Sequence, residues 1–171
     1  MADGSTDVVV IGGGAIGCAT AWELARRGAR VTLLERGVPG RESTWAAAGM
    51  LSPLGESLRD DAYLALSIAS LDRYAAFAES LQAAIGEDLE YRTDGKLYVA
   101  LEEAKRPALD AVFGRGAAFG VERLDAERAR SLEPALSESV TGAVLVRRDH
   151  RIDNRRLGAA LAAAAASAGV D

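Results

Sequence analysis

The sequence predicts an α/β fold with parallel strands. Three observations support this prediction: a short apolar run, a glycine-rich turn directly after it, and an amphipathic segment that leads to a second apolar run. They lie in the stretch VVVIGGGAIGCATAWELARRGARVTLLER, residues 8–36. Parallel strands need a crossover connection, and a helix is the usual one. The stretch therefore predicts a Rossmann-like βαβ unit.

The glycine-rich turn has the spacing of a dinucleotide-binding loop. Residues 7–11 form a short, β-branched apolar run, which predicts a buried parallel strand. Gly12, Gly14 and Gly17 then fit the pattern G-x-G-x-x-G. The first glycine permits a tight turn, the second lets the backbone approach a pyrophosphate, and the third brings helix and strand close together. The helix over residues 15–27 would point its N-terminal amides at the diphosphate.

An acidic residue follows the second strand. Residues 31–34 predict this strand, and Glu35 ends it. A carboxylate at this place in the fold accepts the ribose hydroxyls of an adenosine, and it would repel a 2′-phosphate. The residues therefore favour a dinucleotide other than NADP. The alternative is a tight βα turn that binds no ligand.

A second loop rich in small residues stands where a nicotinamide-binding domain would usually continue with an amphipathic helix. Residues 37–53 read GVPGRESTWAAAGMLSP, and they offer hydroxyls and backbone amides to a ligand. The AAAG run at 46–49 leaves room for a flat ring system beside the backbone. It could equally form a short helix packed in the core, and the residues alone leave both readings open.

The remaining elements follow from apolar periodicity and from residues that begin or end helices. Helices are predicted over 56–85, 102–119, 126–132 and 154–167, and strands over 121–124 and 142–147. The D-G pair at 94–95 predicts a β-hairpin with strands 89–92 and 96–101. The last residues, 169–171, resemble the approach to another strand. The residues that mark helix ends or boundaries are Gly86, Pro107, Asp125 and Asp153.

Composition narrows the class of protein. The chain has 20 Lys and Arg against 25 Asp and Glu, so its net charge of −5 argues against a nucleic-acid partner. Cys18 is the single cysteine, which excludes an internal disulfide and gives no metal-binding pattern. His150, the single histidine, is expected in a solvated loop. Residues 1–7 lack the features of a signal peptide, and the alanine tract at 157–170 is too short to span a membrane. We expect a cytoplasmic protein without a membrane segment.

The segments IGGGAIG, ELARRGARVTLLERG and STWAAAGMLSP together resemble the FAD-dependent amino acid oxidase family, which is D-amino acid oxidase-like. Within it they look most like the glycine oxidases of thiamine biosynthesis. RIDNRRLGAALAAAAASAG is similar to that family's return segment, so the resemblance runs from residue 7 to the end. It implies an FAD-binding domain, incomplete here, at 1–86 and 141–171. Part of a second, α+β substrate domain is then inserted at 87–140.

The resemblance also implies which residues bind FAD. The glycine loop and the first helical turn would hold the diphosphate, the end of the second strand the adenosine, and the second loop the rest of the cofactor. The implied residues are Gly12, Gly14, Ala15, Ile16, Gly17, Glu35, Arg36, Ser43, Thr44, Ala48, Gly49 and Met50. Ser52 is expected near the substrate side of the flavin because it follows Met50 closely. The family's substrate-clamping arginine and tyrosine match no residue of this chain, so no catalytic residue is assigned.

The implied activity is the oxidation of glycine, or of another small amine or amino acid, at its C–N bond. The product would be an imine, and molecular oxygen would be reduced to hydrogen peroxide. The resemblance implies a homo-oligomer and a longer protein, so the 171-residue chain is expected to be an N-terminal half that is inactive alone. Two alternatives stay open. One is an NAD-dependent dehydrogenase, and the other is a non-catalytic FAD-binding fragment or subunit that needs a partner chain.

Overall fold

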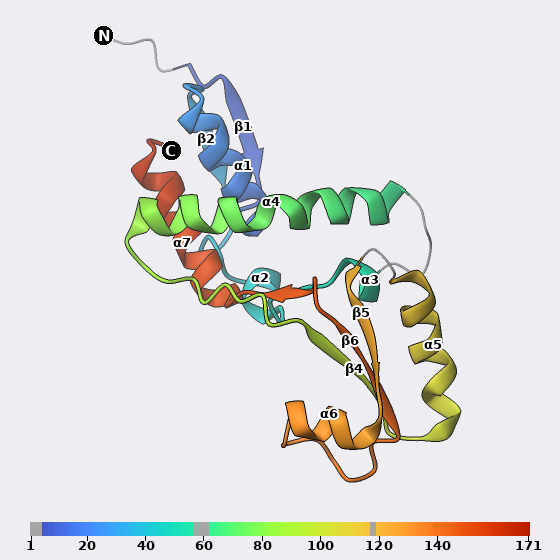
Figure 1. The fold of residues 1–171 in the computed structure, drawn as a ribbon. Coiled ribbons are helices and arrows are strands. Elements are labelled where there is room, and N and C mark those ends of the chain that lie inside the picture. The colour runs from blue at the N-terminus through green and yellow to red at the C-terminus, as the bar shows by residue number, and fades with distance from the viewer. Residues whose placement is uncertain (1–4, 57–61, 117–118) are drawn as a thin grey trace. The chain divides into compact units, whose positions relative to one another are not determined.

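The computed structural model describes residues 5–56, 62–116 and 119–171 (Figure 1). These residues divide into two compact units. The first unit contains the described residues up to Gly49, together with Tyr74–Tyr91 and Ile152–Asp171. The second contains the described parts of Met50–Arg73 and Arg92–Arg151. The chain therefore leaves the first unit after Gly49 and after Tyr91, and it returns to that unit at Tyr74 and at Ile152.

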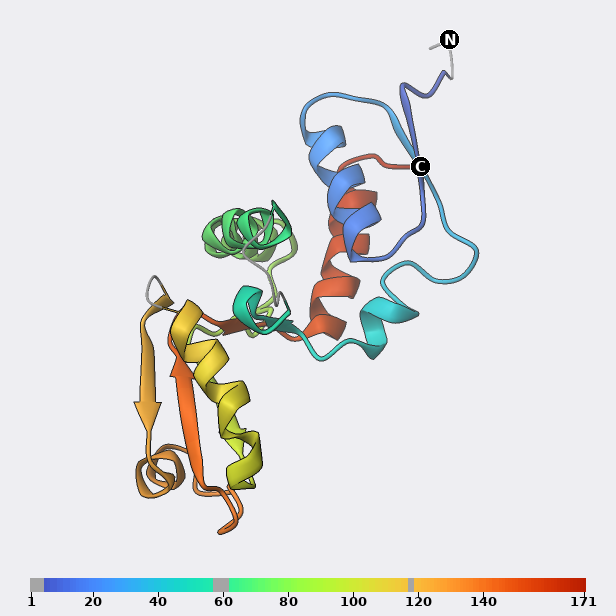
Figure 2. The same ribbon diagram turned by 90° about the vertical axis from the view of Figure 1, so that its right-hand side faces the viewer.

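The first unit is built on the predicted βαβ arrangement. Strands β1 (Val8–Ile11) and β2 (Val31–Leu34) pair in parallel, and helix α1 (Ala15–Arg26) connects them. Helix α7 (Asn154–Ser167) lies beside α1 in both views of the ribbon (Figures 1 and 2). The α/β fold class and the parallel pair are confirmed. Side chains buried on these two helices are Cys18, Ala21, Trp22, Leu157, Ala160, Leu161, Ala164 and Ala165.

One face of the β1–β2 pair is exposed. Val9, Ile11 and Leu34 are 54%, 85% and 52% exposed, and Ile11 stands opposite Leu34 in the register. Beside β2, the Leu33 N–H donates to the Asp171 carbonyl at 2.6 Å, and the Asp171 N–H donates to the Val31 carbonyl at 3.0 Å. Asp171 is thus bonded to β2 as a residue of a third parallel strand would be. Parallel sheets are normally covered on both faces, so the open apolar face is unusual.

The second unit contains a three-stranded antiparallel sheet in the order β4–β6–β5. These strands are β4 (Lys96–Ala100), β5 (Val121–Leu124) and β6 (Gly142–Val146), and every residue of β6 is buried. Helices α5 (Arg106–Arg115) and α6 (Ala126–Leu132) pack against this sheet. One apolar cluster consists of Leu54, Ala100, Leu109, Phe119, Val144 and Val146, and the other of Leu124, Ala129, Val140, Ala143 and Leu145.

The predicted β-hairpin at 89–101 is wrong. Strand β4 pairs with β6, and Arg92 instead bonds to Arg151 through two backbone hydrogen bonds of 2.9 and 3.0 Å. Gly95, with φ of +87°, turns the chain between these two pairings. The physical reason is that β6 is apolar along its whole length, so β4 buries more apolar surface beside β6 than in a local hairpin.

Several predicted helices have different limits in the structure. The segment predicted as one helix at 56–85 contains the end of α3 (Pro53–Glu56) and α4 (Ala62–Ile85), while 57–61 lies outside the described residues. In the segment predicted at 102–119, a 3-10 turn (Glu103–Lys105) precedes α5. Pro107 lies in the first turn of α5 and not at a kink, because proline fits the start of a helix.

Both predicted N-caps are confirmed. The Asp125 carboxylate accepts from the Arg128 N–H at the start of α6, and the Asp153 carboxylate accepts from the Arg155 and Arg156 N–H groups at the start of α7. Within 5–56, 62–116 and 119–171, no helix is long and apolar enough to cross a bilayer. The same residues hold no group of three or more side chains that could hold a metal ion.

Candidate cofactor site

The glycine turn brings strand β1 and helix α1 into close contact. Gly12 has a φ of +103°, a conformation that side chains rarely adopt. A Cβ atom at Gly17 would overlap the Gly12 carbonyl oxygen, so this position of α1 accepts no side chain. At Gly13 a Cβ would lie 3.0 Å from the Glu35 Cβ. The lack of Cβ atoms at Gly13 and Gly17 therefore allows the turn to pack closely against Glu35 and against the start of α1.

Glu35 is held by the backbone on both sides. Its Oε2 accepts from the Gly13 N–H at 2.7 Å, and its Oε1 accepts from the Gly37 N–H at 2.8 Å. The Gly13 bond and then the Gly37 bond lower the pKa of the carboxyl, so it is ionised at neutral pH. A carboxylate offers about four lone-pair sites. The sites that the backbone bonds leave unused can accept hydroxyl groups.

The second loop is tied to the start of α1 through Thr44. The loop contains the short helix α2 (Ser43–Ala46), and the Thr44 Oγ1 accepts from the Ala15 N–H at 2.9 Å. Asn154, the first residue of α7, donates from its Nδ2 to the carbonyls of Thr44 at 2.7 Å and Trp45 at 2.9 Å. The structure therefore brings Ala15 and Thr44 together. It adds Asn154, which sequence reasoning had missed as a site residue.

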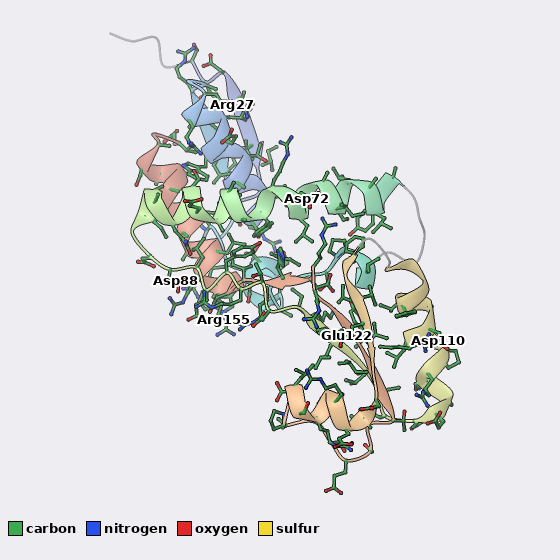
Figure 3. The ribbon with its side chains drawn as sticks, viewed as in Figure 1. Arg27, Asp72, Asp88, Asp110, Glu122 and Arg155 are labelled. Carbon is green, nitrogen blue, oxygen red and sulfur yellow. The ribbon has the colours of Figure 1, made fainter. Side chains whose placement is uncertain are left out.

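Trp45 contacts two guanidinium groups. The Cζ of Arg41 is 3.7 Å from the centre of a Trp45 ring, and the Cζ of Arg155 is 4.9 Å from it. Arg155, labelled in Figure 3, projects from the N-terminal turn of α7. Such cation–π contacts hold the indole in place. Arg36, by contrast, is mostly exposed and pairs with Glu42 at 3.3 Å.

The AAAG run is an exposed turn and not a helix packed in the core. Ala46, Ala47 and Ala48 are exposed, and only Ala46 belongs to α2. Gly49 has a φ of +72°, and a Cβ there would overlap the Ile152 carbonyl oxygen. The Ile152 N–H in turn donates to the Gly49 carbonyl at 2.9 Å. The reading of a short helix packed in the core is therefore wrong, and the room for a flat ring system stays a prediction.

Met50 and Ser52 differ in exposure. Strand β3 (Met50–Leu51) pairs with β7 (His150–Arg151), and Met50 is 52% exposed. Ser52 is only 4% exposed, although the sequence predicts it near the substrate side of the flavin. His150 lies in β7 and is partly buried, so the prediction of a solvated loop residue is wrong. Burial lowers the pKa of its imidazole.

The N-terminus of α1 is suited to an anionic group. Gly14 is its N-cap and makes no side-chain capping bond, and the first turn contains no acidic residue. The helix dipole places partial positive charge at this end. Ile16 is 83% exposed on the first turn. Glycines without Cβ atoms, a positive helix end and the remaining acceptor sites of Glu35 together fit a nucleotide diphosphate and its ribose.

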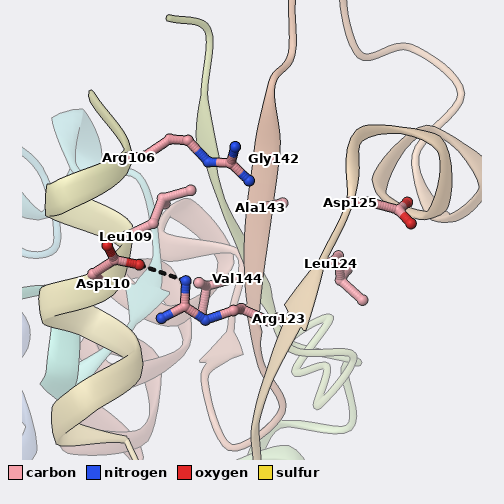
Figure 4. Close-up of a pocket in the computed structure, with 9 residues that line it drawn as sticks. All are labelled: Arg106, Leu109, Asp110, Arg123, Leu124, Asp125, Gly142, Ala143 and Val144. Carbon is pink, nitrogen blue, oxygen red and sulfur yellow. Dashed lines mark hydrogen bonds and ion pairs between the residues drawn. The ribbon is translucent and has the colours of Figure 1, made fainter. Parts of the chain in front are cut away.

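The second unit has a pocket of about 170 Å³ between α5 and the β5–β6 edge (Figure 4). Arg106 and Arg123 line it together with Gly142. Arg106 pairs with Glu103, and Arg123 pairs with Asp110. Because both guanidinium groups already have carboxylate partners, the pocket is not prepared for an anionic ligand. The site of interest is the glycine turn.

Known proteins are similar to this chain in sequence and in fold. Glycine oxidase from Geobacillus kaustophilus is 37% identical over 166 residues, which are 95% of this chain and 44% of that protein. Its crystal structure superposes with a TM-score of 0.91, covering 97% of this chain and 45% of that one. The Synechocystis bifunctional protein ThiO/ThiG is 36% identical over 168 residues, which are 97% of this chain and 24% of that protein. The chain spans less than half the length of these curated relatives.

The family comparison covers nearly the whole chain. The model of the DAO family, described as FAD dependent oxidoreductase, matches residues 7–171. This match includes the glycine turn, Glu35 and the second loop. The resemblance inferred from the sequence is confirmed, and the cofactor of the family is FAD and not NAD. The chain belongs to the DAO family of FAD dependent oxidoreductases.

Proposed function

We propose that this chain is the FAD-binding part of an oxidase that acts on glycine or another small amine or amino acid. The substrate would be oxidised at its C–N bond to an imine, and molecular oxygen would be reduced to hydrogen peroxide. Support comes from the relatives named glycine oxidase, to which the chain is similar over 95% of its length in sequence and over 97% in structure. Because it spans less than half their length, we expect no turnover by the chain alone.

The observation that carries the proposal is the contact between the two loops at the start of α1. Thr44 bonds to Ala15, and Glu35 bonds to Gly13, so both loops are anchored beside the glycine turn. In the proposed complex, the α1 amides near Ile16 hold the diphosphate, and Glu35 accepts the ribose hydroxyls. FAD, when bound, supplies the two-electron chemistry that no side chain provides. The chain's own residues supply binding and orientation.

Titration of the chain with FAD, followed by flavin fluorescence, tests the cofactor assignment. Glu35→Gln keeps the shape of the side chain but removes the charge that strengthens its bonds to ribose hydroxyls. We expect the Kd for FAD to rise about tenfold to a hundredfold, since hydrogen bonds to charged groups contribute about 1.5–3 kcal/mol. Glu122→Gln in the second unit, where Glu122 pairs with Arg147, is the matched control and should leave the Kd unchanged.

Three results would contradict the assignment. The first is a wild-type chain that takes up no FAD, and the second is a Glu35→Gln variant that binds FAD as tightly as the wild type. The third is binding of NAD in place of FAD. A change of the same size in Glu122→Gln would show that the effect of the Glu35 substitution is not local.

The substrate is tested in a protein extended to the length of the relatives. Anaerobic glycine is expected to bleach the visible absorbance of the flavin, and readmitted air should then yield one hydrogen peroxide for each imine formed. Glycolate has the same carboxylate but no amine, so it serves as the control. Bleaching by glycolate and not by glycine would refute oxidation at a C–N bond.

A second candidate is a flavin-binding subunit that another polypeptide completes. The open apolar face of β1–β2 and the strand-like bonding of Asp171 favour it. We expect the chain to associate with the separately produced C-terminal part of the Geobacillus enzyme, as measured by light scattering. Ile11→Lys on the open face should abolish this association, whereas Leu66→Lys, at an exposed position of the second unit, should not. Equal effects of both substitutions would refute it.

A further inference from the structure

Three helix ends of the first unit are joined by side chains of two residues. Helix α2 lies beside the start of α7 in both views of the ribbon (Figures 1 and 2). The Asn154 Nδ2 of α7 donates to the carbonyls of Thr44 and Trp45 at 2.7 and 2.9 Å. The Thr44 Oγ1 accepts in turn from the Ala15 N–H of α1 at 2.9 Å. Thr44 thus connects the start of α7 to the start of α1.

Helix α2 is too short to hold its own position. It has four residues, and a single helical turn is unstable alone because it fixes several residues for one hydrogen bond. Its N-cap Glu42 has a φ of +60°, which is rare for a residue with a side chain, and it makes no side-chain capping bond. Such a conformation persists only where the surroundings determine it. The position of α2 must therefore come from contacts with other elements.

Asn154 provides the contact that the C-terminal end of α2 lacks. The carbonyls in the last turn of a helix have no partner within that helix, and every carbonyl of a four-residue helix belongs to this turn. The side-chain amide of asparagine has two N–H donors, which match the Thr44 and Trp45 carbonyls. Asn154 therefore caps α2 from a different helix.

Backbone contacts with α7 and the residues before it hold the two ends of the second loop. The Ile152 N–H donates to the Gly49 carbonyl at one end. At the other end, a Cβ atom at Gly158 would lie 2.6 Å from the Gly40 carbonyl oxygen, so the two backbones touch. These contacts do not reach Thr44 in the middle of the loop. Its backbone carbonyl is held by the Asn154 side chain.

The Thr44 hydroxyl is oriented at the start of α1. The Ala15 N–H is among the first amides of α1, which have no partner within the helix, and the N-cap Gly14 has no side chain to offer. The Thr44 oxygen fills this role. Its hydroxyl proton has no acceptor in the part of the chain that the structure describes. This proton is therefore available to an anionic oxygen beside the glycine turn.

We propose that Asn154 is a positioning residue for FAD, because it holds α2 so that Thr44 stays bonded to Ala15. Asn154 acts through Thr44 and not by contact with the cofactor. This role rests on the proposed function, since Thr44 is predicted to lie along FAD.

Amide hydrogen exchange at Ala15, in the chain without FAD, tests the link between the two helices. Asn154→Ala removes both donors, so exchange at Ala15 should accelerate about threefold to tenfold, as for the loss of one or two hydrogen bonds. Thr44→Val removes the acceptor itself and should accelerate the exchange at least as much. An unchanged rate in Asn154→Ala would overturn the proposal.

The matched control weakens α7 without touching the loop. Ala163 is an exposed residue in the middle of α7, and glycine is a poor helix former. Ala163→Gly should lower the free energy of unfolding and leave the Ala15 exchange rate under native conditions unchanged. Acceleration of equal size in Ala163→Gly would mean that only the stability of α7 matters, and it would refute the positioning role.

Asn154→Asp separates positioning from the stability of α7. The substitution keeps the shape of the side chain, but a carboxylate cannot donate to carbonyls. An acidic residue in the first turn favours a helix, so α7 itself should be at least as stable as in the wild type. The proposal expects faster exchange at Ala15 despite this gain. A merely structural role expects no change, and that result would overturn the proposal.

Titration with FAD tests the consequence for the cofactor. Asn154→Ala and Thr44→Val should each raise the Kd about threefold to tenfold, and the double variant should raise it no further, because both substitutions break the same link. Ala163→Gly should leave the Kd unchanged. Fold-changes that multiply in the double variant would show that Asn154 acts independently of Thr44, which contradicts the proposal. An unchanged Kd in Asn154→Ala would refute it as well.

The two proposals can fail separately. A chain in which Asn154 controls exchange at Ala15, but which takes up no FAD, would refute the proposed function and keep the link between the helices. A chain that binds FAD equally well with and without the Asn154 side chain would refute the role of Asn154 alone. If Thr44→Val fails to fold, the comparison of Asn154→Asp with Ala163→Gly still decides the question.

Discussion

At the scale of single residues, Gly17 determines how closely α1 approaches β1. The carbonyl oxygen of Gly12 occupies the space where a Cβ of residue 17 would lie. Any side chain there would push the helix away from the turn. The first amides of the helix would move with it, and these are the groups that the proposed diphosphate contacts need.

Gly17→Ala should therefore destabilise the chain and weaken FAD binding together. We expect a loss of about 1–3 kcal/mol in the free energy of unfolding, as in other cases of overpacking, measured by urea denaturation. Gly114→Ala is the matched control, because a Cβ in this part of α5 meets no atom within 4 Å. Its expected effect is neutral or slightly stabilising, since alanine favours a helix. A neutral Gly17→Ala would contradict the close contact.

The residues of the site differ in how far the sequence reveals them. Gly17 and Glu35 follow from a local pattern, because their spacing reflects one βαβ unit. Thr44 was inferred from a resemblance, and its bond to Ala15 could not have been read from spacing. Asn154 was missed because it bonds to Thr44 across 110 positions of the sequence. The only signal for Asn154 was its place as a polar residue directly after a helix cap.

At the scale of elements, the cap of α7 has two functions. The Asp153 carboxylate closes the first turn of α7, and that turn carries the Asn154 side chain that fixes the second loop. Asp153→Ala should cost about 0.5–2 kcal/mol in the free energy of unfolding, and Asp153→Asn much less, because asparagine also caps helices. Urea denaturation measures both. Equal losses in the two variants would mean that charge, and not capping, is what matters.

The wrong hairpin shows where local patterns stop being informative. The D-G pair at 94–95 is a good turn signal, and Gly95 does adopt a positive φ. The choice of strand partner, however, depends on β6, which lies far away in the sequence and is buried along its whole length. Short-range turn chemistry predicted the bend, whereas burial selected the pairing.

At the scale of the whole molecule, packing divides the chain differently from the predicted domains. The described part of Met50–Arg73 packs in the second unit although the prediction assigned it to the FAD-binding domain. Leu54 and Ile68 explain this, because both contact the apolar cluster around Val144. Such contacts are not visible in the order of elements. The compact units describe packing, so the division into cofactor and substrate domains stays a prediction.

The stability of the fold should decrease at acid pH. The side chain and the backbone N–H of Arg30 both donate hydrogen bonds to Asp7, and these bonds lower the pKa of the Asp7 carboxyl to about 2. Hydrogen bonds also lower the pKa of Glu35, Asp94 and Asp153. A carboxyl with a lowered pKa stabilises the fold above its unfolded value of about 4, and this contribution is lost as the pH falls towards the folded value.

We therefore expect the Tm of the chain to fall between pH 4 and pH 2, as followed by circular dichroism. Asp7→Asn should reduce the size of this fall, because the variant has no carboxylate to protonate at this position. A fall of equal size in the variant would mean that the Asp7–Arg30 pair contributes nothing. A flat profile in the wild type would contradict the inferred pKa shifts as a group.

The buried thiol of Cys18 gives the glycine turn its own chemical reporter. Its Sγ donates to the Gly13 carbonyl at 3.1 Å, and burial raises the pKa of the thiol. Cys18 is the single cysteine of the chain, so a maleimide alkylates only this residue. The reaction requires the turn to open, because the thiol is buried. The half-life of labelling then measures how often the turn opens. A nucleotide that holds the turn closed will lengthen this half-life, and no probe has to be introduced.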